Sequence, residues 1–125
     1  DFRMEEVSSQ KIKKQGDQVI WTLVKNPDIL KTVTEQKEHQ FVVAFAAETE
    51  NLLENAREKR TAKRADLMVA NDVTQQGAGF EGDTNIVTFI DEKEEEAMPL
   101  QSKVLVADQI LSRVKRGVQE KRSLR

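Results

Sequence analysis

The chain has 125 residues, of which 38% are hydrophobic and 34% are charged, and its formal net charge is −2. That length suits one domain with a single core, and the nearly balanced charge excludes a general attraction to nucleic acid or to an acidic membrane. The lack of cysteine excludes disulfides, thiolate metal sites and a cysteine nucleophile, and it fits a reducing compartment such as the cytoplasm. The longest apolar run, 41–47, is too short to cross a bilayer.

A strand and a helix are predicted in the first third of the chain. Val19–Val24 is a short β-rich run that ends at Lys25, and Trp21 within it is most simply a core residue. Asn26 has the residue type of a helix N-cap, and Pro27 suits the first helical position because its missing N–H would have no partner there. A strand that leads directly into a helix is therefore expected.

A second strand and helix follow, and then a third strand. The nearly continuous apolar run 41–46 predicts a strand covered on both faces. Thr49 is expected to cap a helix with Leu52 and Ala56 on its apolar side, and Leu67–Ala70 is the third strand. Strands that alternate with helices pair in parallel through right-handed crossovers. The sequence therefore predicts an α/β fold, a Rossmann-like three-layer αβα sandwich with a mostly parallel sheet.

The last third predicts one more strand and a long helix. Ile86–Ile90 is the strand, and Phe89 within it is expected in the core. Ser102 introduces a helix whose hydrophobic residues recur at helical spacing. No helix separates the third strand from Ile86–Ile90, which leaves an antiparallel last strand open. The acidic segment Glu92–Glu96 is interpreted as a solvated hairpin or loop, with a metal site as the alternative.

Three glycines have the spacing of a dinucleotide-binding fingerprint. Gly77, Gly79 and Gly82 spell G-x-G-x-x-G, but that fingerprint has to follow a strand and open a helix. Here a strand follows, so we interpret the glycines as turn residues. A Rossmann-type dinucleotide oxidoreductase is kept only as an alternative function.

Polar residues follow the expected carboxyl ends of three strands, which is where open parallel sheets bind ligands. The loops concerned are Lys25–Asp28, Ala47–Glu50 and Asn71–Asp72. Two of them open helices, whose free N–H groups attract anions. Considered alone, however, Asn26 and Thr49 are more simply helix caps and nothing else.

Two groups of lysines are candidates for binding phosphates. Lys59 and Lys63 are four residues apart, so their ammonium groups point from one face of a helix. Lys11–Lys14 precedes the first strand and can close over phosphates as a lid. Without further context both groups are more simply solvated surface. The residues therefore indicate a nucleotide or phosphate binder, with a non-catalytic interaction module as the alternative.

Six segments, taken in chain order, carry a resemblance that spans nearly the whole chain. They are Asp1-Phe2-Arg3, Lys11–Lys14, Lys25–Ile29, Phe45–Thr49, Ala70–Val73, and Gly79-Phe80 followed by Asp83–Asn85. These segments resemble those of the phosphopantothenate–cysteine ligases, the domain at the C-terminal end of bacterial bifunctional pantothenate-metabolism flavoproteins. Ala44 departs from the glycine expected before Phe45.

The resemblance implies an enzyme that joins 4′-phosphopantothenate to cysteine in coenzyme A synthesis, with CTP as co-substrate and Mg²⁺ as cofactor. The substrate carboxylate would attack the α-phosphorus of CTP, and the cysteine amine would then release CMP from the acyl-cytidylate. A homodimer is also implied, with Ile86–Ile90 expected at its contact, and FMN only where a decarboxylase domain precedes. In this family further strands, a glycine-rich loop and an asparagine lie upstream of Asp1. The chain is therefore expected to be the C-terminal part of one ligase domain, N-terminally truncated and with little or no activity alone.

The resemblance also implies site residues. Lys11 is the catalytic candidate, for the amide-forming half of the reaction, and no metal ligands are identified. The positions that match nucleotide contacts are Asp1, Lys11, Asn26, Pro27, Asp28, Ile29, Phe45, Lys59 and Lys63.

Overall fold

The computed structural model describes residues 1–13, 16–79 and 81–124. Lys14 and Phe80, which belong to two of the matching segments, therefore lie outside the described residues. The elements, in chain order, are β1 (Phe2–Met4), β2 (Leu23–Lys25), α1 (Ile29–Glu35), β3 (Val43–Glu48), α2 (Leu52–Ala62), β4 (Leu67–Asp72), β5 (Thr84–Asn85), β6 (Val87–Ile90), β7 (Glu95–Ala97), β8 (Gln101–Ser102) and α3 (Lys103–Ser123).

The main sheet is mixed and has the strand order β3-β4-β6-β7. β3 and β4 pair in parallel, with Glu48 opposite Asp72 at their carboxyl ends. β6 is antiparallel to β4, and β7 is antiparallel to β6. In the described part of the chain no helix lies between β4 and β6 or between β6 and β7, and the chain reverses at each step. The prediction of a mostly parallel sheet is therefore wrong beyond β3 and β4, whereas the antiparallel last strand and the acidic hairpin are confirmed.

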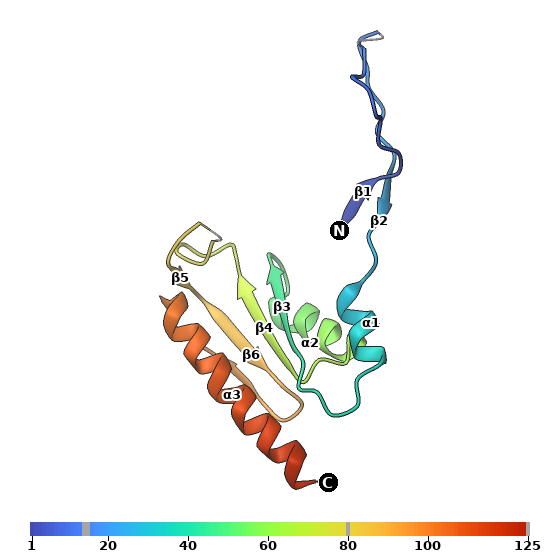
Figure 1. Cartoon of the computed structure of the whole chain (residues 1–125). Coiled ribbons are helices and arrows are strands. Elements are labelled where there is room, and N and C mark those ends of the chain that lie inside the picture. Colours follow the sequence, from blue (N-terminus) through green and yellow to red (C-terminus); the bar gives the residue numbers. More distant parts are fainter. Residues whose placement is uncertain (14–15, 80, 125) are drawn as a thin grey trace.

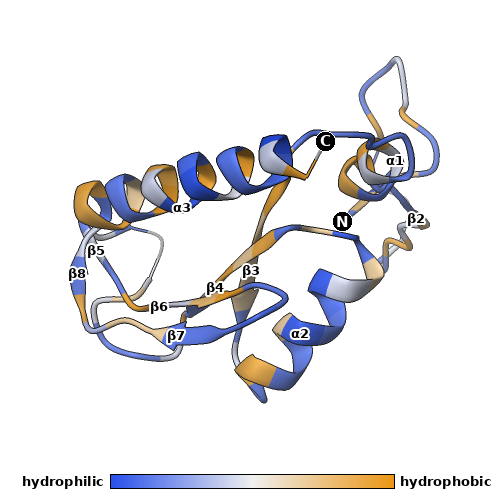
Figure 2. Ribbon diagram, turned by 90° about the horizontal axis from the view of Figure 1, so that it is seen from below, coloured by the Kyte–Doolittle hydropathy of each residue, from blue (hydrophilic) through white to orange (hydrophobic). Residues whose placement is uncertain are grey.

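Helices cover both faces of this sheet, α2 on one side and α3 on the other (Figure 2). On the α2 side, small side chains of β3 pack with Ala56 of the helix. On the α3 side, Val69 and Phe89 of the sheet pack with Val106. Phe89 is only 1% exposed, which confirms its predicted place in the core. Within the described ranges, no helix combines the length and the apolar character needed to span a membrane.

β1 and β2 form a separate antiparallel ribbon rather than part of the main sheet. The ribbon and the loop at its tip project away from the body of the molecule (Figure 1). Trp21 is 69% exposed, so the prediction of a sheet strand at Val19–Val24 with a core tryptophan is wrong. The physical reason is that β-propensity reports a local preference, while burial requires a layer that covers the strand. Among the described residues, β2 pairs with the short strand β1 and with no other strand.

Two of the three predicted helix N-caps are wrong. The Asp28 carboxylate accepts a hydrogen bond from Lys31 N at 3.0 Å and caps α1, so Asn26 is not the cap. The N-cap position of α2 is Asn51, which makes no side-chain cap bond, so Thr49 does not cap that helix. Both helices start later than predicted, and a cap serves only N–H groups two or three residues beyond it. Ser102 caps α3 as predicted.

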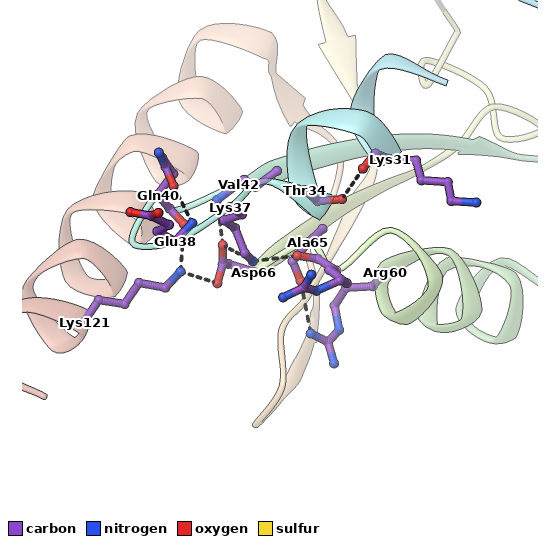
Figure 3. A network of polar contacts seen from close by, with 11 residues as sticks. Lys31, Thr34, Lys37, Glu38, Gln40, Val42, Arg60, Ala65, Asp66 and Lys121 are labelled. Atoms are coloured by element: carbon purple, nitrogen blue, oxygen red, sulfur yellow. Dashed lines mark hydrogen bonds and ion pairs between the residues drawn. The ribbon is translucent and has the colours of Figure 1, made fainter. Parts of the chain in front are cut away.

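Asp66, just before β4, links three elements at the end of the sheet where β3 and β4 begin (Figure 3). Its carboxylate accepts a hydrogen bond from Val42 N at 2.7 Å and one from Lys37 Nζ at 3.1 Å. Its other oxygen lies 2.7 Å from Lys121 Nζ in α3. The junction therefore holds the end of α1, the entry to β3 and the last turns of α3 together.

The dimer contact expected at Ile86–Ile90 is not available in this fold. β6 has β4 on one edge and β7 on the other, and all four of its residues are buried. A strand with both edges paired offers neither backbone groups nor side chains to a second chain. That prediction is wrong, because periodicity does not reveal which strands lie inside a sheet.

Candidate functional site

An ion pair closes the carboxyl end of β3. Glu48, the last residue of the strand, is only 6% exposed, because strand alternation places it on the same face as Ala44 and Ala46, toward α2. Its Oε1 atom lies 2.5 Å from Nζ of Lys59 in α2. The Lys59 side chain itself stays 48% exposed. The ammonium group therefore lies at the boundary between the core and the solvent.

A second ion pair joins the end of α2 to the start of α1. Lys63, at the C-cap of α2, has its Nζ atom 3.5 Å from the Asp28 carboxylate at the start of α1. The hydrogen bond from Lys31 N lowers the pKa of Asp28, and the charge of Lys63 lowers it further. Asp28 thus remains a carboxylate at neutral pH. The structure therefore gives both predicted lysines of α2 an acidic partner.

The remaining candidate residues are not gathered at these ion pairs. Phe45 is 70% exposed, and alternation along β3 turns it to the face opposite Glu48, the α3 side. The prediction that both faces of this strand are covered is therefore wrong, because β3 is an edge strand and α3 does not cover Phe45. Ile29 is exposed on the first turn of α1. Asp1 and Asn26 lie side by side on the ribbon, where Asn26 N donates to Asp1 O at 2.9 Å. Pro27 lies between the ribbon and α1.

Lys11 lies in the segment between β1 and β2, and the ribbon formed by these strands projects away from α2 (Figure 1). The hydrogen bonds that hold the ribbon join its own two arms, for example Glu5 N to Thr22 O at 3.0 Å. This ribbon has the form of a separate arm attached at one end.

The carboxyl end of β4 carries two further polar residues to which sequence reasoning gave no individual role. Asn71 Nδ2 donates to Ala78 O at 3.0 Å, while its Oδ1 atom is buried without a partner among the described residues. Asp72 accepts hydrogen bonds from Thr74 and Gln75, which lower its pKa. The only sequence signal for them was a polar pair directly after the apolar run of β4. Glu48, at the end of β3, was missed as a lysine partner, because its only sequence signal was likewise a polar residue directly after an apolar run.

A cavity of about 690 Å³ lies at the other end of the sheet, where β3 and β4 begin. Acidic and basic side chains both line it, among them Asp66, Arg60 and Lys121, and several of these bind one another. None of the predicted nucleotide contacts lines this cavity. We therefore assign the candidate site to the ion pairs of α2. In the part of the chain that the structure describes, no group of three acidic or histidine side chains is placed to hold a metal ion.

A mixed sheet between two helices, with carboxylate-held lysines beside its edge strand, defines an α/β domain with cationic groups presented to solvent. The chain belongs to the family described as DNA/pantothenate metabolism flavoprotein C-terminal domain, whose model matches residues 1–118.

Relatives of known name support this assignment. The chain is 41% identical to the coenzyme A biosynthesis bifunctional protein CoaBC of Escherichia coli K12, over 97% of this chain and 31% of that protein. It is 44% identical to the protein of the same name from Bacillus subtilis, over 91% of this chain and 28% of that protein. The chain therefore spans about a third of the length of these relatives.

Solved structures agree with the fold. The crystal structure of the C-terminal domain of a CoaBC protein superposes with a TM-score of 0.74 at 32% identity, over 96% of this chain and 50% of that one. The DNA/pantothenate metabolism flavoprotein from Streptococcus pneumoniae superposes with a TM-score of 0.68 at 24% identity, over 82% of this chain and 44% of that one. At that identity the second likeness supports the fold alone.

Proposed function

We propose that this chain is the part of a phosphopantothenate–cysteine ligase that binds the phosphates of CTP. The observation that carries the proposal is the placement of Lys59 and Lys63 on one face of α2, each held by a carboxylate. Membership of the pantothenate-metabolism family supports it, as does the identity to proteins named for coenzyme A biosynthesis. Nucleotide choice follows the family resemblance, and CTP is the nucleotide we propose.

The proposed reaction proceeds in two steps. A carboxylate oxygen of 4′-phosphopantothenate forms a bond to the α-phosphorus of CTP, and the bond to pyrophosphate breaks. The cysteine amine then attacks the activated carbonyl carbon, loses a proton, and expels CMP with the bonding electron pair. Negative charge shifts among phosphate oxygens in the first step, so cations held in place beforehand lower its barrier.

Lysine suits this role because its ammonium group has three N–H donors. The carboxylate of Glu48 or Asp28 takes one donor of its lysine, which leaves the others for phosphate oxygens. Mg²⁺ in such sites is usually bound through substrate phosphates and few protein carboxylates, so we propose that the nucleotide's phosphates supply most of its ligands.

Lys11 contributes to the proposal as the cation of a lid. It belongs to the segment between β1 and β2, and the ribbon of these two strands projects from the body of the molecule (Figure 1). Closure of that arm would add a charge over the bound nucleotide and exclude water. The proposal further includes a cytoplasmic homodimer and a Rossmann-like nucleotide domain of which this chain is one part.

Calorimetry with CTP, ATP and NAD, each with Mg²⁺, tests the proposal in the natural protein that contains these residues. We expect CTP to bind most tightly, and Lys59→Gln and Lys63→Gln each to weaken that binding. Lys115→Gln, an exposed lysine of α3, is the matched control and should bind CTP normally. Preference for NAD would favour the oxidoreductase, and binding of none of the three would favour an interaction module.

A further inference from the structure

Glu48 is a buried acid that the proposed chemistry does not yet use. It is 6% exposed and shares its face of β3 with Ala44 and Ala46, both in the apolar cluster under α2. A carboxylate in such a place loses hydration, which is costly unless a cation or donor replaces the water. The Lys59 ammonium group, at 2.5 Å, is that replacement.

The burial of the two partners is unequal, and this asymmetry matters. The Glu48 side chain is 8% exposed while the Lys59 side chain is 48% exposed. A lysine on a free surface samples many rotamers, and holding its side chain in one of them costs entropy. Here the acid is fixed by the strand and the core, so the flexible partner is the one that is held. Glu48 therefore fixes the position of the Lys59 ammonium group, and not the reverse.

The neighbouring pair provides a contrast. Lys63 lies 3.5 Å from Asp28, and both side chains are more than one third exposed. An exposed pair of this length restrains its lysine weakly. Of the two lysines on this face of α2, Lys59 is thus the one whose position is set before any ligand arrives.

We propose that Glu48 is a positioning residue that holds the Lys59 ammonium group at the place where the nucleotide's β- and γ-phosphates bind. The inference rests on the proposed function and adds to it the residue that prepares the phosphate site. Preparing the lysine in advance reduces the entropy lost on binding. Glu48 does not touch the nucleotide itself, and its carboxylate would repel phosphate if Lys59 did not lie between them.

The test compares the binding of Mg²⁺–CTP with that of CMP, which lacks the two outer phosphates. In the natural protein that contains this chain, Glu48→Gln should weaken CTP binding about tenfold, because Lys59 is no longer held for its charge-assisted contact with the phosphates. CMP binding should stay unchanged. A merely structural role for Glu48 would weaken both ligands together. Glu120→Gln, which breaks the exposed pair with Lys93, is the matched control and should change neither.

A double-mutant comparison separates this inference from the proposed function. In a Lys59→Met background, Glu48→Gln should have no further effect on CTP affinity, because the held group is gone. If Lys59→Met weakens CTP binding but Glu48→Gln does not, the inference fails and the proposed function stands. If neither substitution changes CTP binding, both fail. If Glu48→Gln does not fold, Glu48→Asp retains the charge, sets it one methylene back from Lys59, and should show the same loss for CTP alone.

Discussion

Asp66 Oδ1 lies 2.7 Å from Lys121 Nζ, although the two residues are far apart in the sequence and belong to different layers of the fold. Lys37 and the Val42 N–H bind the other oxygen of the same carboxylate (Figure 3). Burial on its own would raise the pKa of Asp66, but the hydrogen bonds from Lys121, Val42 N–H and Lys37 lower that pKa below its ordinary value. The junction is therefore a source of stability that depends on pH.

We expect Asp66→Asn to reduce the free energy of unfolding at pH 7 by about 1–3 kcal/mol, because two ammonium groups lose their shared acceptor. A carboxylate with a lowered folded-state pKa stabilises fully above its unfolded pKa and loses that contribution as pH falls through the folded value. The difference between wild type and variant should therefore shrink below about pH 4. Urea unfolding at pH 7 and pH 3 measures it, and an equal difference at both values would contradict the ionic explanation.

Gly117 is the site of a second stability prediction. A helical Gly→Ala change usually stabilises by up to about 1 kcal/mol. At Gly117 the new Cβ would lie only 2.0 Å from Cε2 of Phe41. We therefore expect Gly117→Ala to destabilise by about 1–3 kcal/mol through overpacking, measured by thermal unfolding.

Two further variants check that explanation. Ser112→Ala, at an exposed position of the same helix, should stabilise slightly and shows that α3 tolerates alanine elsewhere. Phe41→Leu removes the ring that blocks the new methyl group. The pair Gly117→Ala with Phe41→Leu should therefore be more stable than the sum of the single changes predicts. Strict additivity would rule out the contact as the cause.

Asp28 has a helix-capping role that can be separated from a role in binding. Its Oδ1 caps α1 and its Oδ2 faces Lys63. Asn is as good an N-cap as Asp, so Asp28→Asn should keep the melting temperature, whereas Asp28→Ala should lower it. If Asp28 orients Lys63 toward the phosphates, both variants should change the CTP affinity that calorimetry measures. If only Asp28→Ala changes the CTP affinity, Asp28 acts as a helix cap and not in binding.

Lys11 is predicted to act in catalysis rather than in folding. Lys11→Gln should leave the melting temperature unchanged and lower kcat/KM of the ligase reaction, with a loss of about 1.5–3 kcal/mol for one charge-assisted contact. Lys13→Gln removes the same charge from the same loop and should have the smaller effect. Pyrophosphate release in the natural protein that contains this chain is the assay. Unchanged kcat/KM in Lys11→Gln would remove Lys11 from the mechanism.

The exposed Trp21 reports on the proposed lid. It is the only tryptophan of the chain and stands on the ribbon with 69% exposure. Its fluorescence should be quenched readily by acrylamide without ligand. Addition of Mg²⁺–CTP should reduce that quenching if the ribbon closes over the nucleotide, while CMP should protect less. Equal quenching with and without CTP would show that the ribbon does not close.

Several elements could be predicted because local signals and tertiary packing agree in them. The apolar runs of β3 and β4 predict strands, and burial on both faces is found for β4, while β3 exposes Phe45 on one face. Ser102 and the helical spacing after it predict α3, since a cap and a buried stripe act along one element. Lys59 and Lys63 share a face for the same reason, because four residues make about one turn.

Other features depended on contacts between distant segments. The β-rich run around Trp21 has the local character of a strand, yet the fold leaves it on an exposed ribbon. The direction of β6 followed from the lack of a helix before it, but its place between β4 and β7 did not.

The sequence by itself determined the α/β class, the existence of the strands β3 and β4, the long final helix and the pair of lysines on one helical face. These follow from periodicity within single elements and from the order of the elements along the chain. The tertiary structure alone decided that Glu48 holds Lys59, that Asp28 faces Lys63, and that Asp66 joins α1, β3 and α3. Such contacts join residues whose separation in the chain carries no period, so only the packing of complete elements brings them together.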